Sequence, residues 1–226
     1  DNQVPTAAQC ALFLESRRLL DRATRWVLTA RGGTVDVEAE IERFRSEIAR
    51  ITPLVPGMLV GIERERLLQR ADELEALGAP RDLALESGAL LDIFGLLDVV
   101  EVAQATGSDS EDVARLYFAL SERFEVDRIL TRITQLPRDD RWSALARAAL
   151  RSDLYGALVG MTRRVIEATP ALTDPAERIE VWEVQTAEGL ARARATLDEI
   201  GELETFDLAT LSVALRTIRT LVQQGA

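Results

Sequence analysis

The sequence predicts an all-α fold, and three observations support this prediction. Apolar residues recur at helical spacings of three and four along almost the whole chain. Ala, Leu, Glu and Arg dominate a composition that is 47% apolar and only 5% aromatic, as is typical of helical proteins. No segment alternates cleanly between apolar and polar residues over a strand's length. We therefore expect about eight to ten helices and no sheet in the 226 residues.

Glycine, proline and capping residues divide the first half of the chain into predicted helices. The expected segments are a helix with the apolar face Leu12, Leu19, Ala23, Trp26 and Ala30 that ends at Gly32-Gly33; a helix capped by Asp36 that carries Ile41, Phe44 and Ile48 and ends before Pro53; a turn at Pro56-Gly57; a charged helix over 59–77 ended by Gly78; a short helix started by Pro80; and an apolar helical segment over 93–106.

The second half shows the same alternation of caps and apolar faces. The expected segments are a helix opened by a capping box at Ser108-x-x-Glu111 and continuing to Phe124; a helix over 127–136; a long helix with Trp142, Leu145, Ala149, Leu154, Leu158, Met161 and Val165, ending at Thr169-Pro170; a helix capped by Asp174 that carries Ile179, Trp182, Leu190, Ala193, Leu197 and Ile200; and a final helix capped by Asp207. The break at residues 136–139 is the candidate seam between two subdomains.

The chain contains no histidine, no lysine and one cysteine, Cys10. These three side chains supply most proton shuttles, Schiff-base amines, activated nucleophiles and transition-metal ligands. Arginine provides every positive side chain and stays protonated near neutral pH, so it cannot serve as a base there. We therefore expect a chain that packs and binds, with no catalytic, cofactor-binding or metal-binding residue, and an inert Cys10.

Charge and hydropathy limit the partners and the compartment. The net charge of -11 disfavours nucleic acid and anionic membranes, which attract basic surfaces. The most apolar stretch, 89–103, is interrupted by Asp92, Asp98 and Glu101, and no apolar run reaches the ~18 residues of a membrane span. With one cysteine, the fold needs no intrachain disulfide. The expected location is the cytoplasm.

Nucleotide-binding and hydrolase motifs are missing from the sequence. There is no G-x-G-x-x-G and no G-x-S-x-G, and a P-loop requires a lysine. The acidic groups Asp109-Glu111-Asp112 and Asp139-Asp140 fit helix N-termini better than a Ca²⁺ loop, because they lack EF-hand spacing. Two carboxylates that converge from different helices would be needed for a hydrolase, and this alternative stays open.

Arginines and tryptophans are the remaining candidates for binding. Arg17, Arg18, Arg22 and Arg25 share one helical stretch, and Arg163-Arg164 form a second pair. Interleaved acidic residues favour ion pairs within the chain or between subunits over anion binding. The three tryptophans at 26, 142 and 182 lie in phase with apolar faces, so we expect them in the core, with interface anchoring as the alternative.

Several segments resemble the carboxy-terminal helical region of the large bacterial NAD-specific glutamate dehydrogenases. The resemblance covers nearly the whole chain. Its segments are RRLLDRATRW (17–26), DVVEVA (98–103), VARLYFALSERF (113–124), LPRDDRWSALARAALRSDLY (136–155) and FDLATLSVAL (206–215). The last two segments are the most specific.

The resemblance implies an oxidoreductase of amino-acid catabolism as the parent protein. That family converts L-glutamate, NAD⁺ and water to 2-oxoglutarate, ammonium and NADH, in a core that uses lysines and a Rossmann-type NAD domain. None of these motifs occurs here, so no catalytic or cofactor residue is carried over. The first residue is Asp1 and not methionine, which fits a piece of a longer chain, and a cleaved terminus would look the same.

The expectation from residues and resemblance together is a non-catalytic C-terminal domain over 1–226. It would pack on the dehydrogenase core of its own chain and contribute to a homo-oligomer. We nominate the 89–100 region and the face of residues 154–165 as docking surfaces. The alternative is an independent helical scaffold or regulatory adaptor that binds another protein.

Overall fold

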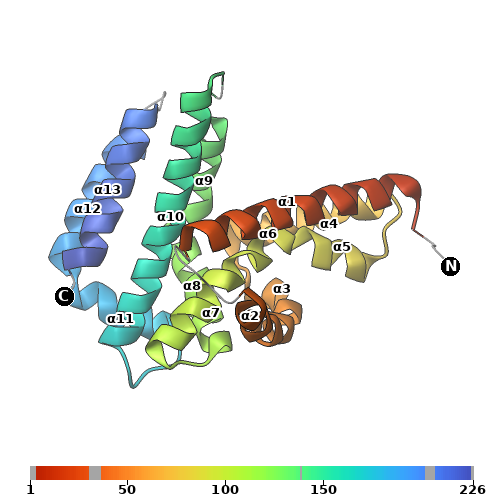
Figure 1. Cartoon of the computed structure of the whole chain (residues 1–226). Helices are drawn as coiled ribbons and strands as arrows, with labels where there is room; N and C mark the ends of the chain where they lie inside the picture. The colour runs from red at the N-terminus through yellow and green to blue at the C-terminus, as the bar shows by residue number, and fades with distance from the viewer. Residues whose placement is uncertain (1–3, 31–36, 138, 202–206, 225–226) are drawn as a thin grey trace. The chain divides into compact units, whose positions relative to one another are not determined.

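A computed structural model describes residues 4–30, 37–137, 139–201 and 207–224 (Figure 1). These residues form helices and no strand, which confirms the all-α fold class for the described part of the chain. Two of the α-helices there, α3 and α6, are single turns of four residues, and the other eleven have eight residues or more. The contacts divide the chain into two compact units, 1–114 and 115–226.

The first unit combines long helices with most of the short ones. Its elements before α8 are α1 (Thr6–Ala30), α2 (Val37–Ile51), the 3-10 helix η1 (Thr52–Leu54), α3 (Val55–Met58), α4 (Gly61–Ala76), α5 (Arg81–Gly88), α6 (Leu90–Ile93) and α7 (Gly95–Thr106). Helices α4 and α5 pack on each other and on α1, while α2 packs on α7. Figure 1 shows α1 lying along α4 and α5.

Small side chains let α1 approach α4 and α5 closely. Ala8 of α1 is fully buried in a cluster with Ala71 and Leu74 of α4. Ala79 and Ala84 complete the cluster from the connection and from α5, and Leu12 of α1 packs against its edge. Alanine contributes little apolar area, so this contact stabilises α1 less than a leucine-rich interface would.

Glycines with positive φ end two helices where the sequence predicts it. Gly78 follows α4 with φ of +95°, and Gly107 follows α7 with φ of +67°. Both lie in a backbone region that costs glycine nothing because it has no Cβ. Gly32-Gly33 and Asp36, the predicted boundary of the first two helices, lie outside the described residues.

Two predicted features near helix starts are corrected. Pro56-Gly57 is not a turn but part of the one-turn helix α3, where proline occupies a position at which its missing N–H has no helical acceptor. Helix α8 (Ser110–Arg123) is capped by Asp109, whose carboxylate accepts a hydrogen bond from the Glu111 amide at 2.8 Å. Ser108, the predicted cap, instead pairs its hydroxyl with that of Thr106.

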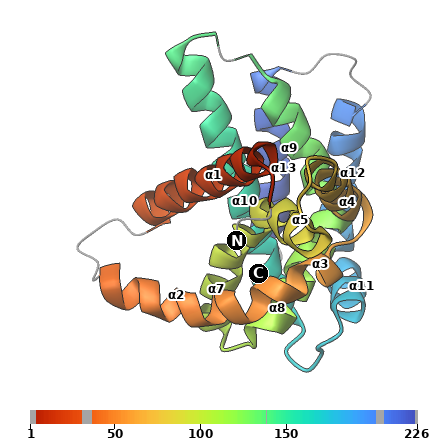
Figure 2. The same ribbon diagram turned by 90° about the vertical axis from the view of Figure 1, so that its right-hand side faces the viewer.

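The second unit is built from long helices. They are the later part of α8, then α9 (Val126–Gln135), α10 (Arg141–Ala168), α11 (Pro175–Gln185), α12 (Ala187–Gly201) and α13 (Leu208–Gln224). Helix α10 packs on α9, α11 and α13, and α12 packs on α13. Figures 1 and 2 show α9, α10, α12 and α13 running side by side, with α11 near one end of α10 and α12.

Aspartate caps occur at the predicted starts of the second unit's helices. Asp140 accepts hydrogen bonds from the amides of Trp142 and Ser143, and Asp174 accepts one from the amide of Glu177. Asp207 accepts one from the amide of Thr210. Each carboxylate satisfies N–H groups that the first helical turn leaves without a backbone partner.

One predicted helix is divided in two. The segment 175–201 was expected to be continuous, but α11 ends at Gln185 and α12 begins at Ala187. At the break the Thr186 hydroxyl donates a hydrogen bond to the Trp182 carbonyl at 2.7 Å. The Thr186 amide donates to the same Trp182 carbonyl at 3.0 Å, so this carbonyl accepts two hydrogen bonds from Thr186 at the break. Residues 136–139, the candidate seam, connect α9 to α10, which pack on each other; the seam stays a prediction.

Candidate functional site

Three of the acidic residues that the sequence singles out serve as helix caps or ion-pair partners, namely Asp109, Glu111 and Asp140. The hydrogen bonds from the Ser143 amide and hydroxyl lower the pKa of Asp140, and the Trp142 amide adds to this effect. The amide of Thr210 likewise lowers the pKa of Asp207. A carboxylate whose ionised form is favoured in this way is a poor general acid at neutral pH.

Asp109 and Glu111 meet Arg50, at the end of α2. The Arg50 guanidinium lies 3.2 Å from Asp109 and 3.9 Å from Glu111, and 2.9 Å from Glu47 of its own helix. Its hydrogen bond with Glu47, and the charges of all three carboxylates, raise the pKa of Arg50. No local pattern predicts this contact, because Arg50 lies about sixty positions before Asp109 and Glu111.

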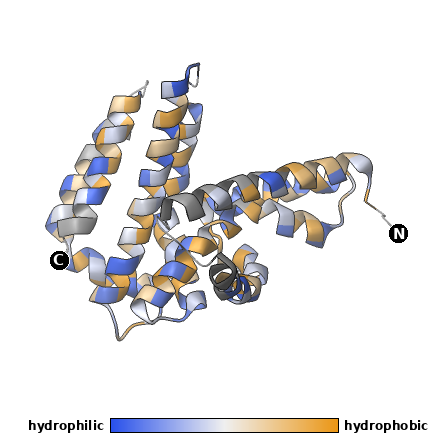
Figure 3. Cartoon of the chain, viewed as in Figure 1, coloured by the Kyte–Doolittle hydropathy of each residue, from blue (hydrophilic) through white to orange (hydrophobic). Residues whose placement is uncertain are grey.

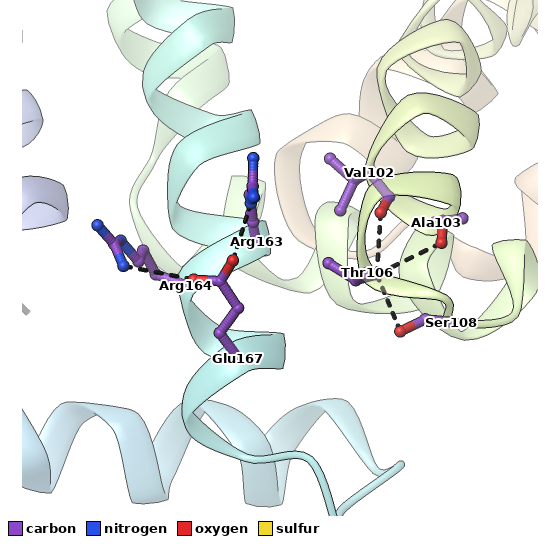
Figure 4. A network of polar contacts seen from close by, with 7 residues as sticks. All are labelled: Val102, Ala103, Thr106, Ser108, Arg163, Arg164 and Glu167. Atoms are coloured by element: carbon purple, nitrogen blue, oxygen red, sulfur yellow. Dashed lines mark hydrogen bonds and ion pairs between the residues drawn. The ribbon is translucent and has the colours of Figure 1, made fainter. Parts of the chain in front are cut away.

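The paired arginines of α10 also bind within the chain. Glu167 accepts a hydrogen bond from Arg163 at 2.8 Å and one from Arg164 at 3.3 Å, as expected for residues three and four apart (Figure 4). A separate network in Figure 4, at the end of α7, joins the Thr106 hydroxyl to the Val102 carbonyl at 2.9 Å. The two hydrogen bonds to Glu167 favour the ion-pair interpretation of Arg163-Arg164 over anion binding.

Glu183 of α11 is the most enclosed member of an ion-pair group on the second unit. Arg123 donates to both of its carboxylate oxygens, at 2.8 and 2.7 Å, and Arg194 donates at 2.9 Å. The hydrogen bonds from Arg123 lower the pKa of Glu183. The group ties α8, α11 and α12 together through charge-assisted hydrogen bonds.

Metal binding finds no support among the described residues. Within the described part of the chain, no three His, Cys, Asp or Glu side chains lie close enough to hold a metal ion. In the same ranges, no helix is long and apolar enough to cross a membrane.

A groove of about 310 Å³ lies between α10 and α13. Leu150 and Leu215 form its apolar part, and Arg216 and Arg219 bring positive charge. Asp153 sits 3.2 Å from Arg219, so an intramolecular ion pair already meets one of the two positive charges. The groove therefore offers little net attraction for an anion.

The tryptophans differ in their surroundings. Trp182 is 1% exposed and packs edge-on against Phe124, with ring centroids 6.2 Å apart, which confirms it as a core residue. Trp142 was expected in the core as well, but 74% of it is exposed and the Arg141 guanidinium lies over its ring. Trp26 belongs to α1, and its side chain lies outside the described set.

Helical geometry explains the exposure of Trp142. At about 100° per residue, Trp142, Leu145 and Ala149 fall on one side of α10, and the later apolar residues fall nearly opposite. Those later residues face the rest of the unit and are buried, namely Leu154, Leu158, Met161 and Val165. The step of five residues from Ala149 to Leu154 turns the apolar side by about 140° and so separates two apolar faces, of which one is covered.

The two nominated docking surfaces are wrong for the same reason. Residues 154, 158, 161 and 165 of α10 are at most 1% exposed, and most apolar side chains of the 89–100 region are buried as well. Both sets already pack inside the chain, so neither presents a free apolar face. The described apolar surface lies elsewhere.

An exposed apolar face on α1 was missed by the sequence interpretation. The exposed fractions are 65% for Phe13, 55% for Leu14 and 66% for Leu20, and Cys10 and Arg17 are exposed beside them. We call these five residues the outer face of α1. Figure 3 colours several residues along α1 as hydrophobic. The sequence pattern that could have predicted this face is the helical spacing of its members, which lie three, four and seven positions apart between residues 10 and 20. Cys10, expected to act as an inert small hydrophobe, is in fact exposed.

Comparison with known proteins places the chain in a family. Residues 1–220 match the family described as glutamate dehydrogenase, C-terminal. The NAD-specific glutamate dehydrogenase of Mycobacterium tuberculosis is 40% identical over 220 residues, which are 97% of this chain. The enzymes of the same name from Pseudomonas aeruginosa and Halomonas elongata are 32% and 29% identical over the full chain.

The match covers only a small part of these relatives. The chain spans 14% of the length of each of the three proteins. The resemblance seen in the sequence segments is therefore confirmed, both in family and in region. This chain belongs to the glutamate dehydrogenase C-terminal family.

Proposed function

We propose that this chain is the carboxy-terminal region of an NAD-dependent glutamate dehydrogenase and that it supports the catalytic core without taking part in the chemistry. The match of residues 1–220 to the family carries the first part of the proposal. The parent reaction is the oxidation of L-glutamate by NAD⁺ and water to 2-oxoglutarate, ammonium and NADH. The protein would act in the cytoplasm as a homo-oligomer.

The chemistry of the side chains supports a non-catalytic role. The chain has neither lysine nor histidine, and the carboxylates with described contacts serve as caps and ion-pair partners. Lysines that bind substrate or activate water must come from another part of the parent enzyme. The region would contribute rigid packing that keeps the core in a productive geometry.

The fold also supports an NAD site outside this chain. Dinucleotide sites of the Rossmann type form where parallel strands end and helices begin. The described residues contain no strand, and the sequence contains no G-x-G-x-x-G, so the residues present do not fit such a site.

Two measurements test the proposal. Titration calorimetry of the 226-residue chain with NAD⁺ and with L-glutamate should give no binding heat; micromolar binding of either would overturn the non-catalytic role. Steady-state assays of the full-length enzyme should show NADH formation from glutamate. Removal of this region should lower both specific activity and melting temperature. An enzyme whose kcat and Tm survive the removal unchanged would overturn the supporting role.

A further inference from the structure

Among the described residues of α1, the inward side carries two alanines and one leucine, and three large apolar residues lie on the outward side. Ala8, Ala11 and Leu12 lie on the side that meets α4 and α5. At about 100° per residue, the outer face is centred nearly opposite to them. Burying a phenylalanine or a leucine removes far more apolar area from water than burying an alanine, and so it stabilises a contact more. A helix that covers alanines and exposes Phe13, Leu14 and Leu20 is therefore oriented for a second contact.

We propose that the outer face of α1 docks on the polypeptide that precedes this region in the full-length enzyme. This inference rests on the proposed function. The relatives are about seven times as long as the matched part, and that part is their carboxy-terminal region, so most of their chain lies ahead of it. Only five residues precede α1 in this chain, and the covalent connection gives the preceding polypeptide a high effective concentration at the face.

Arg17 indicates the chemistry of the partner surface. It lies near the middle of the outer face, among Phe13, Leu14 and Leu20. The docking surface should therefore be apolar and carry a carboxylate that pairs with the guanidinium. The same residue disfavours a second copy of α1 as the occupant. A twofold pairing of outer faces would bring two Arg17 side chains together close to the symmetry axis.

Cys10 provides a probe of this face in the full-length enzyme. A maleimide should modify Cys10 at least about tenfold more slowly in the native enzyme than in the urea-unfolded enzyme, because a docked face excludes the reagent. Mass spectrometry of the Cys10 peptide separates it from other cysteines. Cys10 that reacts at the unfolded rate would overturn the proposal, even where the enzyme is fully active, and would leave the proposed function intact.

Paired variants separate docking from general destabilisation. The double variant Phe13→Ser and Leu20→Gln keeps helix propensity nearly unchanged. It should raise the Cys10 modification rate of the native enzyme about tenfold, since the apolar contact is lost. The control is Val184→Ser with Val213→Ser, which removes two exposed apolar side chains from α11 and α13. A control that opens Cys10 equally would contradict the assignment to α1.

Photo-cross-linking identifies the occupant. p-Benzoylphenylalanine at position 14 of the full-length enzyme should form links to peptides from the polypeptide ahead of Asp1. A mixture of isotopically light and heavy enzyme reports whether the linked peptide comes from the same chain. Links to residues 1–226 of another copy would overturn the proposal.

Discussion

Trp182 should be the most costly aromatic residue to remove from the second unit. It is 1% exposed and stacks edge-on with Phe124. A buried aromatic side chain covers about 150–250 Å², and at about 25 cal/mol per Å² this gives roughly 4–6 kcal/mol. Alanine would recover little of that area, and measured costs of such changes are about 3–5 kcal/mol. We expect Trp182→Ala to lower the free energy of unfolding by about 4 kcal/mol.

Trp142 provides a control of identical chemistry in the same unit. It is 74% exposed, and its described ring contact is with Arg141, 5.8 Å from the ring centroid. A cation–π contact at an exposed site contributes about 0.5–1 kcal/mol. We therefore expect Trp142→Ala to cost no more than about 1 kcal/mol.

Urea unfolding followed by far-UV circular dichroism measures both changes. The midpoint and slope for each variant give the free energy of unfolding relative to the starting protein. Trp182→Phe should fall between the two alanine variants, because it keeps an aromatic ring against Phe124. The reasoning is refuted if Trp142→Ala costs as much as Trp182→Ala, or if Trp182→Ala costs less than about 1 kcal/mol.

Two further predictions concern glycines and pH. Gly78→Ala should lower the melting temperature, because φ at this position is +95° and a Cβ would lie 2.6 Å from Pro5. Gly156→Ala should raise the free energy of unfolding by about 0.5–1 kcal/mol, because the position lies inside α10 and has open space around its Cβ. Thermal denaturation that shifts both variants in the same direction would contradict these two predictions. Arg123 lowers the pKa of Glu183 below its ordinary value of 4.5, so this stabilisation is present above about pH 4.5 and is lost as pH falls through the lower folded pKa. Glu183→Gln should reduce the stability at pH 7 by no more than about 1 kcal/mol and flatten its decline under acid, as measured by urea midpoints from pH 3 to 7; an unchanged acid profile would contradict the assignment.

Local sequence signals predicted most helix starts and ends in the described residues. Asp140, Asp174 and Asp207 cap the helices that follow them, because a cap depends only on a side chain and the next three amides. Gly78 and Gly107 end helices for a similarly local reason. Where two local signals competed, the capping-box pattern predicted Ser108 as the cap, and this prediction was wrong because Asp109 caps the helix.

Tertiary packing decided which apolar faces are buried. Trp142 and Leu158 belong to one helix and both recur at helical spacing, yet one is 74% exposed and the other 1%. The neighbouring helices cover only one side of each part of α10, and no property of the residues themselves reveals which side. The same applies to α1, where Ala8 is covered and Phe13 is exposed.

By itself the sequence determined the fold class, the family and the absence of lysine and histidine chemistry, because these follow from periodicity, residue order and composition. Only the tertiary structure decided that the nominated surfaces at 89–100 and 154–165 are internal and that the outer face of α1 is exposed. Burial depends on which helices meet, and such contacts join residues distant in sequence.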